Sequence, residues 1–436
     1  MVDRAVGRAI VADDLTGAMD SGVQLLGAHP VVVQVSSDAG TASAVPTSTT
    51  LVLNTQSRGV AASAAAARVR AASARLREQS RTAWFKKLDS TLRGNVGAEL
   101  AALHAALAPG TILCTPALPA QGRTVVAGEL LVQGQPVTDT PYRDEIVAAA
   151  GSEVLDIVRR QWPTCRAVRL AAPVAAARLG DAVRAGAELV VADAASDSHL
   201  RQLVAAGRRL GHRGRRLLWA GSAALLRALA PAATADRRSA PAGGSREWSA
   251  AAPLLLVAGS RRTLAQAQLQ AALAAPRRPL GVCLQAPVAR GGAPLWNIAG
   301  GAGSGLAERC AAVARSARAL ADGDDLLVWA APPAHAAERS SDAVSRALAE
   351  FAGEVLERST GRPRSLLLVG GDTAYACLRR LGIGAVALAG EVEPYVPWGR
   401  AVGGRWAGSA VISKAGGFGD PGTLQRIRSR LLSPAA

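Results

Sequence analysis

Residues 231–253 read PAATADRRSAPAGGSREWSAAAP, and this stretch divides the chain into two halves. It has no apolar periodicity and is rich in Pro, Ala, Gly and Ser, which is the composition of a linker. A chain of 436 residues also exceeds what one hydrophobic core usually organises. We therefore predict an N-terminal domain over residues 1–230, a linker over residues 231–252 and a C-terminal domain over residues 253–436.

Short apolar runs of strand length alternate with helical segments on both sides of the linker. The predicted strands before it are residues 9–12, 31–35, 50–53, 84–88, 111–114 and 189–192, and those after it are residues 254–257, 326–330, 366–369, 385–388 and 410–412. Such alternation is typical of a mainly parallel sheet with helices on its faces. Both domains are therefore predicted to be α/β.

Composition narrows the class of protein. No window of about 18 residues is apolar and uncharged, and the N-terminus lacks the apolar core of a secretory signal, so we expect a cytoplasmic protein without membrane spans. The five cysteines are scattered and form no C-x-x-C pair, which favours reduced thiols. The formal charge of +17 suggests nucleic acid, but the basic residues are dispersed and aromatics are only 3%, so no nucleic-acid partner is expected.

The basic residues are almost all arginine. Of 50 Lys plus Arg, only Lys86, Lys87 and Lys414 are lysine. Chance retention would explain one of them, but all three fall in segments rich in Gly and Ser. Lysine is a compact point charge whereas arginine is a planar fork, so these positions are candidates for anion binding.

Two carboxylates follow the first predicted strand, in Val11-Ala-Asp-Asp-Leu-Thr-Gly-Ala. Either Asp14 or Thr16 is expected to cap the following helix. Capping needs only one of them. The other polar side chains, Asp13 included, remain available as a metal ligand, a sugar hydroxyl acceptor or a general base.

The segment Phe85-Lys-Lys-Leu-Asp-Ser-Thr-Leu-Arg-Gly-Asn mixes cations, a carboxylate and hydroxyls directly after a predicted strand. A surface loop could hold such a mixture by chance. A pocket for a hydroxy-carboxylate explains it better, because Arg93 can grip a carboxylate with two parallel hydrogen bonds, Lys87 can add charge and Asp89 can accept from hydroxyls.

A third segment, Pro116-Ala-Leu-Pro-Ala-Gln-Gly-Arg-Thr, follows the strand that ends at Cys114. Its prolines and glycine predict a fixed loop with Gln121, Arg123 and Thr124 as polar tips. The loop is either structural or substrate-lining, and its place after a strand favours the second interpretation.

Glycine-rich turns follow three predicted strands of the C-terminal half. They are Gly259-Ser260, Gly370-Gly371-Asp372-Thr373 and Ala415-Gly416-Gly417. Backbone N–H groups at such a turn, before a helix, favour an anion through hydrogen bonds and the helix dipole. Together they suit the polyphosphate of a nucleotide, although neither a P-loop nor a dinucleotide motif is present.

Taken together, these segments resemble the four-carbon acid sugar kinase family almost from end to end. The matching motifs are VADDLTGAMDSG from residue 11, LNTQSRG from 53, KKLDSTLRGNVGAEL from 86, PALPAQGRTVVAGELLVQG from 116, AGSAALLRAL from 220, LVGGDTAYACLRRLG from 368 and SKAGGFGD from 413. The chain departs from the family pattern at Ala415, where Ser is more usual, which would remove one hydroxyl contact to phosphate.

The resemblance implies an ATP- and Mg²⁺-dependent kinase of a four-carbon sugar acid such as threonate, erythronate or 3-oxo-tetronate. It also implies two α/β domains with mainly parallel sheets that face each other across an active-site cleft. The implied sugar-acid residues are Asp13, Asp14, Lys87, Asp89, Ser90, Arg93 and Gly94. The implied ATP residues are Ser260, Gly370, Gly371, Asp372, Thr373, Gly416 and Gly417.

Four of these residues are catalytic candidates, namely Asp14, Lys87, Asp89 and Arg93. Either Asp89 or Asp14 is expected to act as the general base, and no metal ligand is identified. A non-catalytic two-domain protein that binds a sugar acid and regulates something else is the alternative, and it would leave ATP untouched. The substrate's stereochemistry, the hydroxyl that is phosphorylated and the oligomeric state, a homodimer included, stay open.

Overall fold

The computed structural model describes residues 7–27, 29–37, 45–108, 110–143, 151–211, 217–230, 253–275, 279–285, 297–298, 306–331, 341–359 and 365–432. The linker predicted at residues 231–252 lies outside the described residues. The chain forms two compact units, Met1–Asp236 and Arg237–Ala436, which we call unit 1 and unit 2. Among the described residues, no helix has the length and apolar character needed to cross a membrane.

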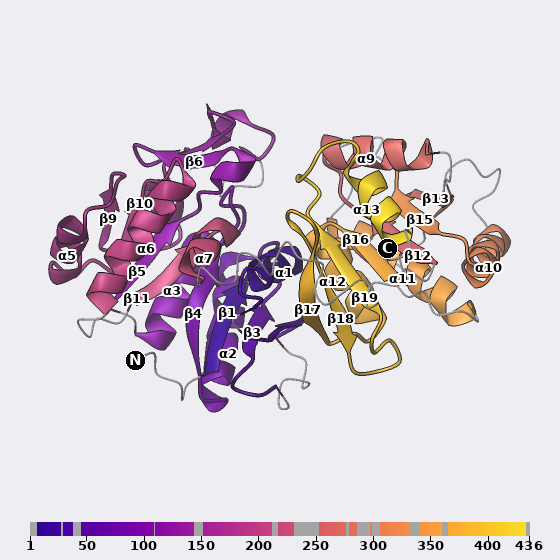
Figure 1. The fold of residues 1–436 in the computed structure, drawn as a ribbon, viewed down its shortest axis with the longest axis horizontal. Coiled ribbons are helices and arrows are strands. Elements are labelled where there is room, and N and C mark those ends of the chain that lie inside the picture. The colour runs from indigo at the N-terminus through magenta and orange to yellow at the C-terminus, as the bar shows by residue number, and fades with distance from the viewer. Residues whose placement is uncertain are drawn as a thin grey trace. The chain divides into compact units, whose positions relative to one another are not determined.

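Unit 1 is built on a parallel sheet (Figure 1). Its strand order is β2 (Val31–Gln34), β3 (Thr50–Asn54), β1 (Gly7–Ala12), β4 (Arg81–Lys87), β11 (Leu217–Gly221), β5 (Thr111–Thr115), β10 (Leu189–Ala192) and β9 (Ala167–Leu170). Every neighbouring pair in this order is parallel. The inner strands are buried along their length, which agrees with their nearly continuous Val, Ile and Leu content.

The helices of unit 1 form two packed groups. The first group contains α2 (Ala62–Glu78), α3 (Val96–Leu107) and α4 (Val154–Arg159), and the second contains α1 (Leu15–Val23), α7 (Ala223–Leu229), α6 (Asp197–Gly211) and α5 (Ala176–Arg184). Because parallel crossovers are right-handed, helices that lead toward opposite edges of a sheet cover opposite faces. Helix α1 leads from β1 toward β2 and α3 leads from β4 toward β5, so the two groups cover the two faces.

Unit 2 has a mixed sheet. Its order is β14 (Asn297–Ile298), β13 (Leu280–Gln285), β15 (Leu326–Ala330), β12 (Leu254–Ala258), β16 (Ser365–Val369), β19 (Ala410–Lys414), β18 (Val396–Val402) and β17 (Ala385–Glu393). Strands β13 to β19 in this order are parallel, whereas β14, β18 and β17 pair antiparallel with their neighbours. Helix α9 (Thr263–Leu273) packs on α13 (Thr423–Leu432), and α11 (Ser341–Arg358) packs on α10 (Leu306–Ala321) and α12 (Gly371–Arg380).

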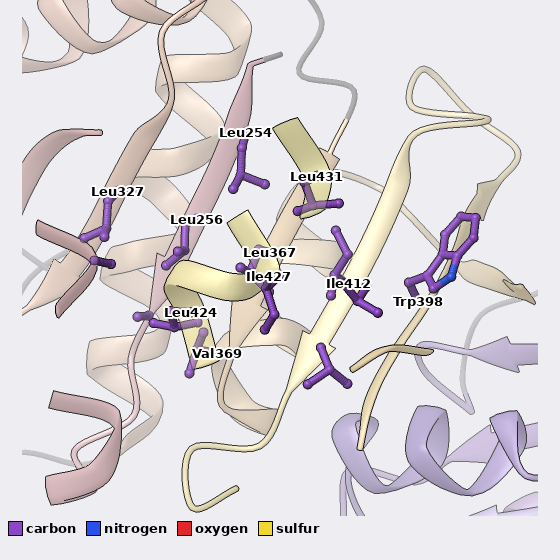
Figure 2. Packing of buried hydrophobic residues seen from close by; sticks show 14 of the residues in the cluster. Leu254, Leu256, Leu327, Leu367, Val369, Trp398, Ile412, Leu424, Ile427 and Leu431 are labelled. Carbon is purple, nitrogen blue, oxygen red and sulfur yellow. The ribbon is translucent and has the colours of Figure 1, made fainter. Parts of the chain in front are cut away.

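The core of unit 2 lies between this sheet and the α9–α13 pair (Figure 2). Leu256 of β12, Leu367 of β16 and Ile412 of β19 are almost fully buried. Leu424 and Ile427 of α13 pack over them. This packing fixes the strand ends from which the glycine turns start, and replacing one of these leucines by Ala would cost about 2–5 kcal/mol.

The two units repeat one arrangement of strands. In unit 1 four strands lie side by side in the order β2-β3-β1-β4, and in unit 2 the strands that correspond to them in chain order lie in the order β13-β15-β12-β16. In both units the helix after the first strand and the helix after the fourth strand belong to opposite groups. The carboxyl ends of β1 and β4, and of β12 and β16, are therefore topological switch points, where open α/β sheets bind their ligands.

Strands β9, β11 and β13 were not predicted from the sequence, and the predictions differ from the structure at three further places. Strand β17 was expected to be followed by a helix, but it turns directly into β18 and forms a β17–β18–β19 antiparallel meander. A second, three-stranded sheet was not predicted; it contains β6 (Arg123–Val126), β7 (Glu129–Val132) and β8 (Gln135–Pro136). Arg123, expected as a polar tip of a loop, is a buried residue that begins β6.

Candidate functional site

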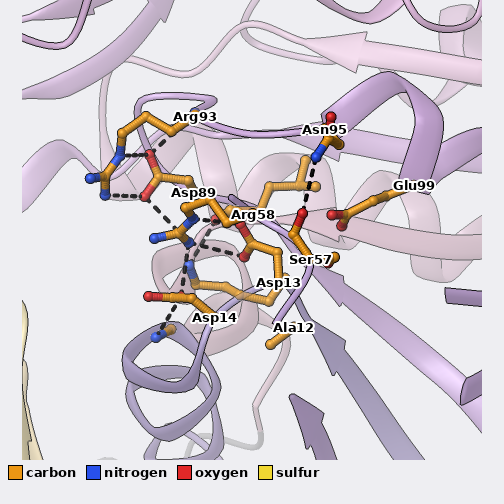
Figure 3. A network of polar contacts seen from close by, with 12 residues as sticks. Ala12, Asp13, Asp14, Ser57, Arg58, Asp89, Arg93, Asn95 and Glu99 are labelled. Atoms are coloured by element: carbon orange, nitrogen blue, oxygen red, sulfur yellow. Dashed lines mark hydrogen bonds and ion pairs between the residues drawn. The ribbon is translucent and has the colours of Figure 1, made fainter. Parts of the chain in front are cut away.

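The polar residues of unit 1 gather where β1, β3 and β4 end (Figure 3). Asp13 and Asp14 follow β1, Arg58 follows β3 and Asp89 follows β4. Because parallel strands present their carboxyl ends at one edge, residues distant in sequence meet there. We call this group the unit 1 cluster; its members are Asp13, Asp14, Arg58, Lys87, Asp89 and Arg93.

Arg58 is the centre of the unit 1 cluster. Its Nε and Nη2 donate to the two carboxylate oxygens of Asp13 at 2.6 and 3.0 Å, and Nη2 also donates to Asp14 Oδ1 at 2.8 Å. The same Nη2 lies 3.6 Å from Asp89 Oδ1. One guanidinium therefore neutralises parts of three buried carboxylates, as its planar fork allows.

Asp14 is the N-cap of α1. Its backbone is extended and its Oδ1 accepts from the N–H of Gly17 at 2.9 Å. The sequence left Asp14 and Thr16 as alternative caps, and the structure selects Asp14. Both contacts of this carboxylate in the described part of the chain use Oδ1, so Oδ2 carries neither the cap nor the Arg58 contact.

Asp89 and Arg93, four residues apart in the same loop, form an ion pair. Arg93 Nε and Nη2 donate to the two oxygens of Asp89 at 2.8 and 2.7 Å, and the hydroxyl of Thr91 donates to Oδ2 at 2.5 Å. The two-pronged grip expected for a substrate carboxylate is thus made to Asp89 in this structure. Gly94 has a φ of +86°, and a Cβ there would come within 2.9 Å of the Arg58 side chain, so glycine lets Arg58 approach.

The pKa values of the three carboxylates diverge. Burial would raise the pKa of Asp89, but Arg93 and Arg58 outweigh it and hold the pKa well below its usual value. Burial likewise opposes Arg58 at Asp13, whose pKa is also lowered. Asp14 differs, because burial together with the negative charges of Asp13 and Asp89 outweighs Arg58 and raises its pKa. Of the three, Asp14 is the best proton acceptor.

The two lysines of this segment are buried and have different surroundings. Lys86 is fully buried and its Nζ lies 2.6 Å from Glu99 Oε2 of α3. Lys87 donates from Nζ to the carbonyl of Leu88 at 2.8 Å. A Cβ on Gly17 would lie 3.2 Å from Lys87 Nζ, so this ammonium stands beside the first turn of α1, where backbone N–H groups also favour an anion.

Tyr142 joins two arginines from separate segments. Arg93 and Arg123 lie 5.7 and 6.0 Å from the Tyr142 ring centroid, and Arg123 Nη2 donates to the Tyr142 hydroxyl at 3.1 Å. The loop expected to line the substrate is thereby brought to the unit 1 cluster through Arg123, whereas Gln121 and Thr124 are half-buried without a described contact to it. Ser90, also expected in the pocket, is buried in the same loop as Asp89.

The glycine turns of unit 2 meet at the ends of β12, β16 and β19. These strands are adjacent, and the N–H of Gly370 donates to the carbonyl of Lys414 at 2.9 Å. A Cβ on Gly416 would lie 1.8 Å from Ser260 Oγ, and a Cβ on Gly370 would lie 3.6 Å from Ser260 N. The three turns predicted from the sequence therefore form one group; we call it the unit 2 cradle, which consists of Ser260, Gly370, Gly371, Asp372, Thr373, Gly416 and Gly417.

The unit 2 cradle has the chemistry of an anion site. Gly370, with a φ of +108°, caps α12 without a side-chain hydrogen bond to its first N–H groups. Thr373 is buried with its hydroxyl 3.4 Å from that of Ser345, and Asp372 is exposed in the first turn. The first N–H groups of a ten-residue helix, beside glycines that admit close approach, suit phosphate.

No group of three or more His, Cys, Asp or Glu side chains suited to hold a metal ion occurs among the described residues. The described cysteines are free thiols, and burial raises the pKa of Cys114, Cys165 and Cys377 to about 12. These thiols are therefore protonated and unreactive at neutral pH.

Sequence reasoning did not single out Arg58, Glu99 or Tyr142. Arg58 had a usable signal, because it lies in the loop that follows the predicted strand over residues 50–53. Glu99 lies inside a helix and Tyr142 lies in an irregular segment, so their roles depend on tertiary contacts that no local pattern encodes.

Comparison with known proteins agrees with a different binding chemistry in each unit. Residues 8–229 match a family model described as a sugar-binding N-terminal domain, and residues 255–424 match one described as a nucleotide-binding C-terminal domain. The chain belongs to the four-carbon acid sugar kinase family, a family of phosphotransferases.

Several relatives align over nearly their whole length. A D-threonate kinase from Bordetella bronchiseptica is 34% identical over 97% of both chains. A 3-oxo-tetronate kinase from Methylobacterium radiotolerans is 31% identical over 94% of this chain and 95% of its own, and a D-erythronate kinase from Heliobacterium modesticaldum is 28% identical over 94% of each. The solved structure of a Salmonella typhimurium LT2 protein has a TM-score of 0.72 at 21% identity, covering 96% of this chain and 98% of its own, which shows a shared fold.

Proposed function

We propose that this protein transfers the γ-phosphate of ATP to a hydroxyl of a four-carbon sugar acid such as threonate, erythronate or 3-oxo-tetronate. The observation that carries the proposal is that two switch points of the same topology bear complementary chemistry. The unit 1 cluster supplies cations and carboxylates for a hydroxy acid, and the unit 2 cradle supplies backbone amides for a polyphosphate. Residues 1–230 are then the sugar-acid domain and residues 253–436 the nucleotide domain.

The sugar acid is bound in unit 1 by charge and by hydroxyl contacts. Lys87 and Arg93 provide the positive charge for its carboxylate, and Arg123 adds a third cation beside Tyr142. Asp13, Asp89 and Ser90 lie in the same loops and accept from or donate to the hydroxyls. Arg58 keeps the aspartates ionised and fixed in orientation.

In the transfer step the acceptor hydroxyl oxygen attacks Pγ while the bond from Pγ to the β–γ bridging oxygen breaks. Asp14 takes the proton of the attacking hydroxyl. This role falls to Asp14 and not to Asp89, because the pKa of Asp14 is raised and that of Asp89 is held well below its usual value. ADP and a phosphorylated acid leave.

The nucleotide is bound in unit 2 with its phosphates on Ser260, on the first turn of α12 and on Gly416 with Gly417. Mg²⁺ neutralises charge on the phosphates when bound, and it generally takes only one or two carboxylates beside phosphate oxygens and water. Asp372, in the first turn of α12, is the carboxylate that the cradle would offer to this metal.

Phosphoryl transfer needs the hydroxyl and Pγ within bonding reach, so we propose that the two sites face each other across a closed cleft in the reacting complex, which excludes water. Steady-state kinetics of two single variants tests whether the acid binds in unit 1 and the nucleotide in unit 2. Lys87→Ala should raise KM for the acid and leave KM for ATP unchanged, whereas Thr373→Ala should do the reverse. Equal effects on both constants in both variants would contradict separate sites.

A further inference from the structure

The three lysines of the chain share one local geometry. Lys86, Lys87 and Lys414 each stand at or next to the carboxyl end of a strand, and each donates from Nζ to the carbonyl oxygen of the next residue. The N···O distances are 3.0, 2.8 and 2.9 Å. All three are buried, although the chain has many exposed arginines. The same arrangement, a buried ammonium that donates to the carbonyl of the next residue, thus occurs at all three lysines.

Lys414 differs from the other two in its counter-charges. Lys86 has Glu99 at 2.6 Å, and Lys87 lies among the aspartates of the unit 1 cluster. Lys414 is fully buried, and its only described side-chain contact is the Ala415 carbonyl at 2.9 Å. A buried cation without a carboxylate partner costs free energy. We therefore expect the charged form of Lys414 to be stabilised by an anion that the free protein does not supply.

The neighbouring charges do not fill that role. The carboxylates that act on Lys414 are Glu393 at the end of β17 and Asp420 beyond the glycine turn. Arg426 of α13 donates to both, to Glu393 at 2.9 and 3.2 Å and to Asp420 at 2.9 and 2.8 Å.

The other elements that pack against β19 add no partner either. Strand β16 carries no charged side chain, Arg400 of β18 pairs opposite Ala410 at the far end of β19, and Arg380 of α12 binds Glu350 and Glu357.

Lys414 is also built into the unit 2 cradle. Its carbonyl accepts the N–H of Gly370, and its ammonium holds the carbonyl of Ala415, the residue directly before Gly416 and Gly417. Orientation of the Ala415–Gly416 peptide sets where the Gly416 N–H points. Lys414 therefore links two of the three turns of the cradle.

We propose that Lys414 is a positioning residue of the nucleotide site, protonated when a polyphosphate occupies the cradle, and that nucleotide binding is thereby coupled to the uptake of a proton. The inference rests on the proposed function, since it takes the ligand of the cradle to be a nucleotide. Lys414 acts through the Ala415 carbonyl and the glycine amides, because its own side chain is fully buried.

The protonation state of Lys414 agrees with this role. Burial lowers its pKa to about 7, against smaller opposite effects of Asp420 and Glu393. In the free protein Lys414 is then mostly neutral at pH 8, and a polyanion nearby favours the charged form and raises the pKa. Affinity for the polyphosphate is highest below the free-state pKa and weakens as pH rises through the window between the free and bound pKa values.

Isothermal titration calorimetry at pH 8, with a non-hydrolysable ATP analogue and Mg²⁺ in two buffers of different ionisation enthalpy, measures the proton uptake. For a rise of about one pKa unit the wild-type protein should take up about 0.4 proton per nucleotide. Lys414→Met, which keeps the length of the side chain without its charge, should take up none and bind about tenfold more weakly near pH 6.5. Lys87→Met removes a unit 1 lysine with the same Nζ-to-carbonyl contact and should leave the uptake unchanged.

Wild-type binding without proton uptake, or equal uptake by Lys414→Met, would overturn the inference while leaving the nucleotide site intact. If Lys414→Met fails to fold, the wild-type protein alone decides the matter. Its nucleotide Kd should increase by about sixfold more between pH 6.5 and 8.5 than ionisation of the analogue accounts for, and no such excess overturns the inference. Absence of any nucleotide binding would instead refute the proposed function.

Discussion

Arg58 is the residue whose removal should disturb unit 1 most. It lies among Asp13, Asp14 and Asp89, with contacts of 2.6 to 3.6 Å, and its side chain is only 19% exposed. Breaking a buried pair by removing one partner costs about 3–5 kcal/mol, because the other charge stays buried without compensation. We expect Arg58→Met to lose about that much stability at pH 8. In a unit of this size that corresponds to a fall of about 10 °C in Tm.

The loss should depend on pH in a definite direction. In the wild type, Arg58 lowers the pKa of Asp13 and Asp89, and this contributes stability that is present above their unfolded pKa and is lost as pH falls through the folded pKa. Without Arg58, the pKa of Asp13 rises, because burial is then opposed only by Lys86 and Lys87, whereas Asp89 keeps its pair with Arg93. The difference between variant and wild type should therefore shrink from pH 8 to pH 5.

Urea unfolding followed by circular dichroism at both pH values tests this reasoning. Arg184→Met is the matched control, because Arg184 pairs with Asp181 on the surface, where an ion pair contributes only about 0–1 kcal/mol. Arg58→Met no less stable than Arg184→Met, or equally destabilised at pH 5 and pH 8, would refute the role assigned to Arg58.

Three further predictions concern the base, the cradle and the buried pair. Asp14→Asn should lower kcat by about 10²–10⁴-fold in a coupled ADP assay and abolish the fall of kcat toward acid pH that the raised pKa of Asp14 produces; a persisting acid limb would exclude this base. Gly416→Ala should raise KM for ATP and not for the acid, since the new Cβ would lie 1.8 Å from Ser260 Oγ, whereas Gly211→Ala, with open space, should change neither. Glu99→Gln should destabilise the protein by about 3–5 kcal/mol in urea unfolding, and the double variant with Lys86→Met should recover part of this loss; no recovery would mean that the pair is not coupled.

Sequence patterns predicted most of the parallel strands, because buried parallel strands are continuous apolar runs, but they missed β9, β11 and β13. Residues 189–192 and 326–330 were predicted with the bounds that β10 and β15 have. Strand β18 was not predicted, because its sequence, VPWGRAV, contains Pro and Gly, which are typical of a turn. The β6–β8 sheet was missed for a similar reason, since its segment contains Gly128, Gly134 and Pro136.

The clustering of the candidate residues at the strand ends was predictable from the sequence, and their contacts with one another were less so. The rule that ligands bind beyond the carboxyl ends of strands identified Asp13, Asp89 and the Gly416 turn. It could not say that Arg93 binds Asp89 within the protein, or that Asp14 and Asp89 have pKa values shifted in opposite directions. Those properties depend on which arginine reaches which carboxylate, and that is decided by tertiary packing.

The central claim is that one hydroxy acid and one nucleotide react on this chain. The most direct measurement incubates the purified protein with ATP, Mg²⁺ and each of D-threonate, D-erythronate and 3-oxo-tetronate, and follows ADP and phosphorylated acid by mass spectrometry. We predict that at least one of these acids yields phosphorylated acid and ADP in equal amounts, and that Asp14→Asn does not. ATP left unconsumed with an acid that nevertheless binds would contradict the kinase assignment and favour a sugar-acid-binding protein without chemistry.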